Sequence, residues 1–183
     1  MPNPAFIVDG HTEQSFIGKI CPGKPVQRTN LNGNGVTIEA IAKKVASLIR
    51  LFGNRHYPII ILVDRENRNE SANELCGLLQ NALENEGITD QDLRIGFADK
   101  MIENWILADY KLIDDIENKP ESTDGLSGAS VIKKIKGSYN KVIDGVELLG
   151  KIDKPTVYNA SPSFKSFVDS LNGVECNYLE FEK

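Results

Sequence analysis

Runs of hydrophobic residues along the chain predict short buried strands separated by helices. Residues 5–8 form a brief apolar run that Gly10 ends, and residues 93–98 form another candidate strand. The clearest element is Pro58-Ile-Ile-Ile-Leu-Val63, because a continuous β-branched run without alternation is typical of a strand buried on both faces. We expect it to be a central parallel strand.

Helical spacing of apolar residues follows these runs. Thr12 is a candidate N-cap for a helix that carries Phe16, and Thr37 is a candidate N-cap for a longer helix that Gly53 ends. Two further helices are predicted, one over residues 71–86 and one that carries Met101 and Trp105. Between the first two helices, residues 22–35 are rich in Pro, Gly and Asn, which predicts a loop with at most one short edge strand.

The order strand, helix, helix, strand, helix, strand, helix predicts an α/β fold with a mostly parallel sheet and helices on both faces. A polar stretch at 117–128 then separates a core, residues 1–116, from a mainly helical extension, residues 117–183, expected to pack on the core. Helices are predicted in the extension at 131–135, 142–149 and 163–171, and a last strand at 176–181.

Composition narrows the class of protein. With 183 residues, 40% hydrophobic and 26% charged, the chain resembles ordinary globular proteins rather than disordered ones. A net charge of -5 argues against a general nucleic-acid coat but leaves room for a local basic groove. No apolar run approaches the roughly 18 residues of a membrane span, so we expect a cytoplasmic protein. Three scattered cysteines, Cys21, Cys76 and Cys176, are expected to be free thiols.

Acidic residues gather where the predicted strands end. Asp9, Asp64 and Asp99 each directly follow a strand candidate, and in parallel sheets the ligand site lies beyond the carboxyl ends of the strands. Crowded carboxylates repel one another, and a divalent cation relieves the repulsion. The sequence therefore predicts a Mg²⁺ or Mn²⁺ site of the phosphoryl-transfer or nuclease type, built from Asp9, Glu13, Asp64, Glu66 and Glu103.

Structural alternatives exist for the same residues. A carboxylate after a strand often caps a helix or interacts with its dipole, and Glu13 is placed to do so. His11 is interpreted as a solvated loop residue and Trp105 as a core anchor. A basic set on the extension either binds phosphates or forms a solvated face: Lys119, Lys133, Lys134, Lys136 and Lys141, with Tyr139. Nothing matches a phosphate-binding Walker loop, a dinucleotide fingerprint or a nucleophilic Ser or Cys with its base.

Several segments resemble known families. Val8-Asp-Gly-His-Thr-Glu13 resembles the V-E-G-x-T-E opening of Toprim-like proteins, and Ile61-Leu-Val-Asp-Arg-Glu66 resembles their D-x-D strand end. Phe97-Ala-Asp-Lys-Met-Ile-Glu-Asn-Trp-Ile-Leu-Ala-Asp109 resembles the E-x-W-x-x-A-D segment of the uncharacterised bacterial family catalogued as domain of unknown function 4276. Later segments resemble that family too, including Tyr139-Asn-Lys141 and Ser161-Pro-Ser-Phe164.

The resemblance implies a Toprim-like fold and a function. It implies that Asp9, Asp64 and Glu66 hold magnesium for cleavage or joining of nucleic-acid phosphodiesters, and that the protein works beside an ATPase in phage defence. Asp9 stands where the Toprim pattern has glutamate, and Glu66 stands where it has the second aspartate. Both keep the charge and change the reach by one methylene, to which catalytic geometry is sensitive.

The predicted function is Mg²⁺-dependent hydrolysis of nucleic-acid phosphodiesters. Glu13, Asp64, Glu66 and Glu103 are the candidate catalytic residues, with Glu13 as a candidate base, and the basic set with Tyr139 is the candidate nucleic-acid surface. The alternatives are a non-catalytic module that binds nucleic acid or docks on an ATPase, and a phosphohydrolase that acts on free nucleotides.

Overall fold

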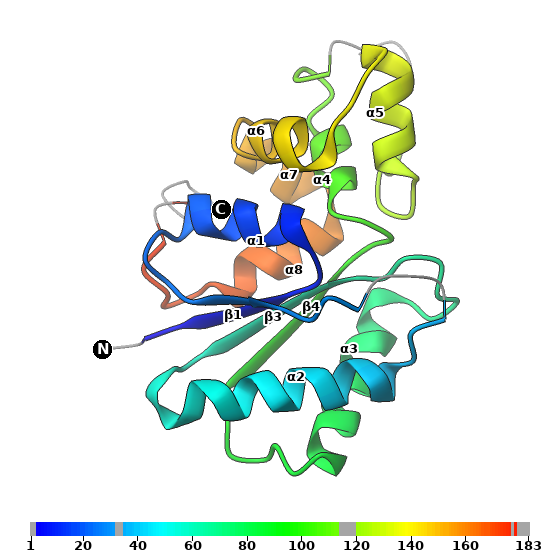
Figure 1. The fold of residues 1–183 in the computed structure, drawn as a ribbon. Coiled ribbons are helices and arrows are strands. Elements are labelled where there is room, and N and C mark those ends of the chain that lie inside the picture. Colours follow the sequence, from blue (N-terminus) through cyan, green and yellow to red (C-terminus); the bar gives the residue numbers. More distant parts are fainter. Residues whose placement is uncertain (1–2, 32–34, 114–119, 177, 179–183) are drawn as a thin grey trace.

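The computed structural model describes residues 3–31, 35–113, 120–176 and 178, and its centre is a four-stranded parallel sheet (Figure 1). The order across the sheet is β2-β1-β3-β4, so β1 and β3 are the inner strands. This confirms the predicted α/β fold and the central place of the β-branched run. The strands are β1 (Ala5–Val8), β2 (Val26–Arg28), β3 (Ile59–Asp64) and β4 (Leu93–Ala98).

Helices cover both faces of the sheet (Figure 1). Two of them, α2 (Ile38–Phe52) and α3 (Ala72–Asn85), cover one face, and η1 (Gly53–Arg55) follows α2. The other face is covered by α1 (His11–Ile20) and α8 (Pro162–Ser170). The remaining elements after β4 lie on the same side, mostly beyond these two helices: α4 (Glu103–Ala108), α5 (Gly128–Lys136), the π-helix η3 (Lys141–Gly145), α6 (Val146–Leu149) and α7 (Lys154–Ala160).

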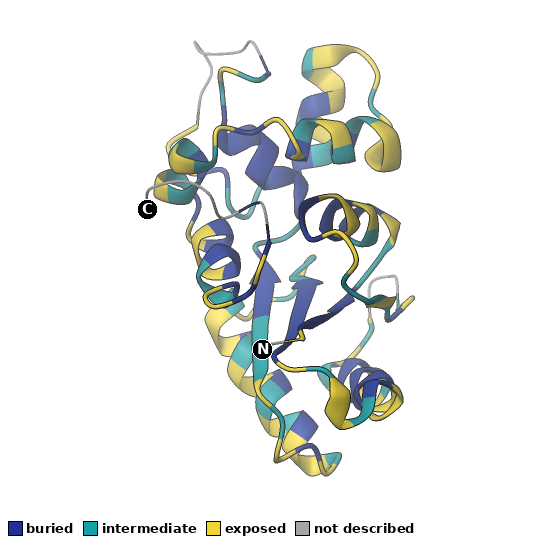
Figure 2. Ribbon diagram, turned by 90° about the vertical axis from the view of Figure 1, so that its left-hand side faces the viewer, coloured by how far each residue is buried: buried dark blue, intermediate teal, exposed yellow. Residues whose placement is uncertain are grey.

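Alternate residues of the inner strands belong to two separate hydrophobic cores. Ile59, Ile61 and Val63 pack with α2 and α3, whereas Ile60 and Leu62 pack with α1, α4 and the C-terminal helices. Successive strand side chains point to opposite faces, so a strand apolar on both faces has to lie between two helical layers. Figure 2 shows this burial, with dark strands between helices whose outer surfaces are exposed.

Local signals account for the starts of α2 and α3. Thr37 Oγ1 accepts a hydrogen bond from Ala40 N, and Ser71 caps α3 with Glu74 in a capping box. The prediction of Thr12 as an N-cap was wrong, because α1 already begins at His11 and Thr12 is buried within it. The predicted short edge strand is β2, which pairs with β1.

The C-terminal half is helical and shares a core with the sheet. Trp105 is fully buried, stacks on Phe167 at 5.2 Å between ring centroids and donates a hydrogen bond to Ser163 Oγ at 2.9 Å. It is therefore a core anchor, as predicted. The helix expected at 142–149 begins with the π-helical turn η3, and α7 was not predicted. The boundary proposed near residue 116 and most of the predicted last strand lie outside the described residues.

The prediction of three free thiols was wrong for two of them. Cys21, at the end of α1, forms a disulfide with Cys176, 155 residues away in sequence, whereas Cys76 is free. Spacing along the chain carries no information on such a distant pair, since only the fold brings the two residues together. A cytoplasmic location stays a prediction. Within the described part of the chain, no helix is long and apolar enough to cross a membrane.

Candidate functional site

Parallel pairing brings the carboxyl ends of β1, β3 and β4 to one edge of the sheet. Val8 is paired with Leu62, and Asp64 is paired with Ala98, so Asp9 and Asp64 lie at neighbouring strand ends. The two acids are also directly linked, because Asp9 Oδ2 accepts a hydrogen bond from Asp64 N at 2.9 Å. The structure therefore brings together two of the three strand-end aspartates that the sequence singled out.

Backbone and hydroxyl donors fix the orientation of both aspartates. Thr29, which is almost fully buried next to β2, donates from Oγ1 to Asp9 Oδ1 at 3.2 Å. Asp64 Oδ1 accepts from Ile102 N at 3.1 Å, at the start of α4. Thr29 was missed by sequence reasoning, since a threonine in a Pro- and Gly-rich loop carries no signal of such a contact.

Glu13 and Glu103 complete the acidic cluster from two helices. Glu13 is 6% exposed in the first turn of α1, and its Oε2 accepts a hydrogen bond from Gly10 N at 3.0 Å. The capping role proposed as an alternative for Glu13 is thus present. Glu103 is the first residue of α4 and is 1% exposed. From here on, "the acidic cluster" means Asp9, Glu13, Asp64 and Glu103.

Burial and mutual repulsion raise the pKa values of Asp9, Glu13 and Asp64. Burial raises the pKa of Asp9 to about 7, and the charge of Glu13 adds to the rise. The pKa of Asp64 is raised well above its ordinary value, first by burial and then by the charges of Glu13, Asp9 and Glu103. Burial also raises the pKa of Glu13, as does the charge of Glu103. These carboxylates are therefore close enough to resist being ionised together.

Two residues of the C-terminal half face the acidic cluster. Lys141 Nζ lies 3.6 Å from Glu103 Oε1. The Tyr139 hydroxyl is buried without a hydrogen-bond partner among the described residues, and its pKa is raised by burial and then by the charges of Glu103, Asp144 and Glu13. Gly145 permits this arrangement, because a Cβ there would lie 2.6 Å from the Tyr139 hydroxyl oxygen.

Glu66 stands apart from the acidic cluster. It is partly exposed and lines a separate pocket of about 350 Å³ with residues of the loop before α2, among them Val36 and Thr37. Its backbone is left-handed, with φ 54°, and its N–H donates to Lys100 O at 2.8 Å. Its charge still contributes to the raised pKa of Asp9, so it borders the cluster without joining it.

Other predicted site residues are not gathered at the acidic cluster. Lys133 and Lys134 are exposed on α5, and Lys119 lies outside the described residues. His11 is exposed at the start of α1. Asp99 pairs instead with Arg65, whose Nε lies 2.5 Å from Asp99 Oδ1.

The donors of the acidic cluster suit a hard cation that keeps much of its water. Among the described residues, no group of three or more His, Cys, Asp or Glu side chains is arranged to hold a metal ion. Magnesium does not need such a cage, since one or two carboxylates with water and substrate phosphate suffice. The oxygens of Asp9 and Asp64 at adjacent strand ends meet that smaller requirement.

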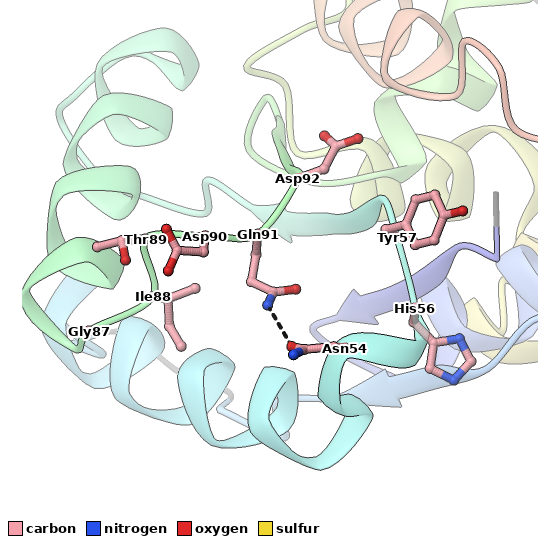
Figure 3. Close-up of a pocket in the computed structure, with 9 residues that line it drawn as sticks. All are labelled: Asn54, His56, Tyr57, Gly87, Ile88, Thr89, Asp90, Gln91 and Asp92. Carbon is pink, nitrogen blue, oxygen red and sulfur yellow. Dashed lines mark hydrogen bonds between the residues drawn. The ribbon is translucent and has the colours of Figure 1, made fainter.

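A different pocket opens at the opposite end of the sheet (Figure 3). It has a volume of about 500 Å³ and is lined by Asn54, His56, Tyr57 and residues 87–92. Gln91 Nε2 donates across it to Asn54 Oδ1 at 3.3 Å. None of the acidic cluster lines this pocket, and the amino ends of parallel strands are not where such folds bind ligands. We therefore place the candidate site at the carboxyl ends.

Comparison with known families identifies the chain at the level of its family. The model of domain of unknown function DUF4276 matches residues 8–172, a range that contains the whole acidic cluster with Tyr139 and Lys141. The chain belongs to the DUF4276 family. This confirms the resemblance to DUF4276 that the segment from Phe97 to Asp109 suggested. No curated protein and no solved structure matches the chain.

Proposed function

We propose that this DUF4276 chain is a divalent-metal-dependent hydrolase of nucleic-acid phosphodiesters, with its centre at the acidic cluster. One observation carries the proposal: four carboxylates, from the end of β1, from α1, from β3 and from α4, gather at the carboxyl edge of a parallel sheet, and burial and mutual charge raise the pKa values of Asp9, Glu13 and Asp64. Buried charges without compensation are costly, so selection for folding alone disfavours them. The resemblance of residues 8–13 and 61–66 to Toprim segments supports the same proposal of metal-dependent phosphodiester hydrolysis.

Each residue has a proposed role. Asp9 and Asp64 would hold the ion through their carboxylate oxygens, with Glu66 at the border of the site and Glu103 as an additional ligand. The bound ion would supply Lewis-acid polarisation of a phosphate oxygen and a more acidic water. Glu13, oriented by Gly10 N–H, is the proposed base, since burial raises its pKa and makes its carboxylate a better proton acceptor.

Substrate contacts are proposed on the C-terminal half. Tyr139 and Lys141 would contact the phosphate next to the acidic cluster, the first as a hydrogen-bond donor and the second as a cation. Lys133 and Lys134, exposed on α5, would bind more distant phosphates of a polynucleotide. A partner ATPase and a role in phage defence are part of the proposal through the Toprim and DUF4276 resemblance alone.

A second candidate function has one observation in its favour. The described residues hold no ready three-ligand metal site, which also fits a module whose acids are structural and which binds nucleic acid or an ATPase without catalysis. The two proposals differ in their response to metal. An enzyme site binds Mn²⁺ or Mg²⁺ and is stabilised by it through mass action, whereas a docking module responds to its partner.

The test is calorimetric titration of Mn²⁺ and Mg²⁺ into the wild type and Asp64→Asn, followed by cleavage assays on single-stranded DNA, duplex DNA and RNA. Asparagine keeps an oxygen for the hydrogen bond from Ile102 N and removes the charge. We expect Asp64→Asn to weaken metal binding roughly tenfold or more, because losing about 1.4 kcal/mol of binding free energy corresponds to a factor of ten. We also expect Asp64→Asn to abolish cleavage.

The control is Asp90→Asn, an exposed aspartate at the opposite end of the sheet, which should leave both readouts unchanged. Absence of metal binding to a folded wild type would overturn the proposal and favour the docking module. Metal binding without cleavage of any polynucleotide, but with hydrolysis of free nucleotides, would redirect it to a small-molecule substrate.

A further inference from the structure

Lys141 forms an unequal ion pair with the acidic cluster. Its Nζ lies 3.6 Å from Glu103 Oε1, and the Lys141 side chain is 55% exposed whereas that of Glu103 is 2% exposed. At 3.6 Å the contact is longer than an N–H···O hydrogen bond, so the ammonium is held mainly by charge. The carboxylate is fixed in the interior, but the ammonium can leave to solvent.

The Lys141 charge acts on more than one acid. It lowers the pKa values of Glu13 and Asp64, opposing the rise that burial causes in both. The ammonium charge therefore acts on Glu13 and Asp64 as well as on Glu103, its nearest carboxylate. That is the position in which a cation relieves the repulsion between the carboxylates.

The backbone beneath Lys141 is firmly held. Lys141 begins η3, where Asn140 Oδ1 accepts hydrogen bonds from Val142 N at 3.0 Å and Ile143 N at 3.1 Å. Asp144 Oδ2 accepts from Asn140 N at 2.7 Å. The turn is thus fixed by its own side chains, and the flexible four-carbon stem of Lys141 is the part free to move.

We propose that Lys141 is a resident counter-cation of the acidic cluster, which a divalent cation displaces so that its ammonium can contact the substrate phosphate. This inference rests on the proposed metal-dependent function. A lysine is a compact point charge, and a divalent ion carries twice that charge into the same group of carboxylates. The displaced ammonium stays within reach of the site because the hydrogen bonds of the turn hold its backbone there.

The first test compares Mn²⁺ affinities by calorimetry in the wild type, Lys141→Met and Lys141→Arg at about pH 8, where protons compete less with the metal. Lys141→Met should bind Mn²⁺ about threefold to tenfold more tightly than the wild type, the range expected for losing one partly exposed competing charge. Lys141→Arg keeps the charge and should bind nearly as weakly as the wild type. Lys43→Met, on an exposed position of α2 at the far face of the sheet, is the matched control and should not change affinity.

A second readout follows the lysine itself. Amine-reactive labelling with mass spectrometry should show faster modification of Lys141 when Mn²⁺ is added, because the ammonium is released from the carboxylates. Modification of Lys43 in the same sample should not respond to Mn²⁺. A purely structural lysine would show no such metal dependence.

The outcomes separate this inference from the proposed function. If metal binds to the wild type, but Lys141→Met binds it equally or more weakly and Lys141 labelling ignores the metal, the counter-cation role is wrong and the metal site stands. If no folded variant binds metal, both the metal site and the displacement are wrong. Folding of each variant is checked by circular dichroism and thermal melting.

Discussion

At the scale of single residues, Asp9 shows how burial and hydrogen bonds have opposite effects on the pKa of a carboxyl group in the acidic cluster. Asp9 is held by hydrogen bonds from Asp64 N and Thr29 Oγ1, yet burial still raises its pKa to about 7. The hydrogen bonds favour the charged form and burial opposes it, and burial has the larger effect. The folded protein thus binds a proton at Asp9 more tightly than the unfolded chain does.

The pKa of Asp9 leads to a prediction about stability and pH. A folded-state pKa near 7 against an ordinary value of 3.8 favours folding fully below pH 3.8, and this contribution is lost as the pH rises to about 7. The whole shift corresponds to about 4 kcal/mol, and partial exposure reduces the effect. Asp9→Asn should therefore raise the free energy of unfolding of the metal-free protein by about 2 kcal/mol at about pH 8, and by much less at about pH 4.

Urea denaturation at the two pH values with a chelator present measures this difference. Asparagine can accept from Asp64 N with its oxygen and donate to Thr29 Oγ1 with its amide, so the local hydrogen bonds survive. Asp90→Asn serves as the exposed control and should stay within about 0.5 kcal/mol of the wild type at both pH values. Equal stability changes for Asp9→Asn at both pH values would contradict the assignment of a raised pKa.

At the scale of elements, the turns after three strands share a left-handed residue. Asn30, Glu66 and Lys100 have φ of 55°, 54° and 72°, and each lies two positions beyond the end of β2, β3 or β4. Glutamate and lysine have no side-chain property that favours this region. Such strained backbone tends to cluster at functional sites, and here it borders the acidic cluster on the carboxyl edge of the sheet.

Relieving the strain at Lys100 should stabilise the protein. Lys100→Gly removes the contact between Cβ and the following carbonyl oxygen and keeps Lys100 O as the acceptor for Glu66 N. We expect the free energy of unfolding to rise by about 0.5–1 kcal/mol, measured by urea denaturation. The same change at Lys43 within α2 should lower it by about 1 kcal/mol, since glycine disfavours a helix interior. A loss of stability for Lys100→Gly would show that its side chain contributes more than the strain removes.

Regular elements were predictable where one local signal dominates. The β-branched run before Asp64 predicted β3, and the helical spacing with Thr37 as cap predicted α2. Elements set by tertiary packing were not predictable from the sequence. Among them are α7, which is short, and η3, a π-helical turn fixed by Asn140 and Asp144. The same division holds for the site. Strand-end acids were visible in the sequence, but the approach of Tyr139 and Lys141 depends on how the C-terminal half folds back.

At the scale of the whole molecule, Cys176 and Tyr178 reinforce the helix that carries Glu13. Tyr178 packs edge-on against Phe16 of α1 at 5.6 Å between ring centroids, and Cys176 is bonded to Cys21 at the end of the same helix. The other end of α1 holds Glu13 in the acidic cluster. The C-terminal half therefore contributes to the candidate site in two ways. Lys141 forms an ion pair with Glu103, and the disulfide fixes the far end of the helix that carries Glu13.

Reduction of the disulfide should destabilise the whole fold. A cross-link that closes a loop of this length restricts the unfolded chain, and disulfides of this kind contribute about 2–4 kcal/mol. For a chain of this size that corresponds to a fall in melting temperature of roughly 5–15 °C when reductant is added. Differential scanning calorimetry with and without reductant, at a fixed protein concentration, measures the shift.

Variants assign the shift to one pair of cysteines. Cys176→Ser should melt like the reduced wild type and no longer respond to reductant, whereas Cys76→Ser should keep the full response, because Cys76 is free. Thiol titration of the denatured, unreduced protein should find the single thiol of Cys76, and all three after reduction. Three reactive thiols without reductant, together with melting that ignores reductant, would mean that Cys21 and Cys176 meet as thiols and that packing, without a covalent bond, holds α1.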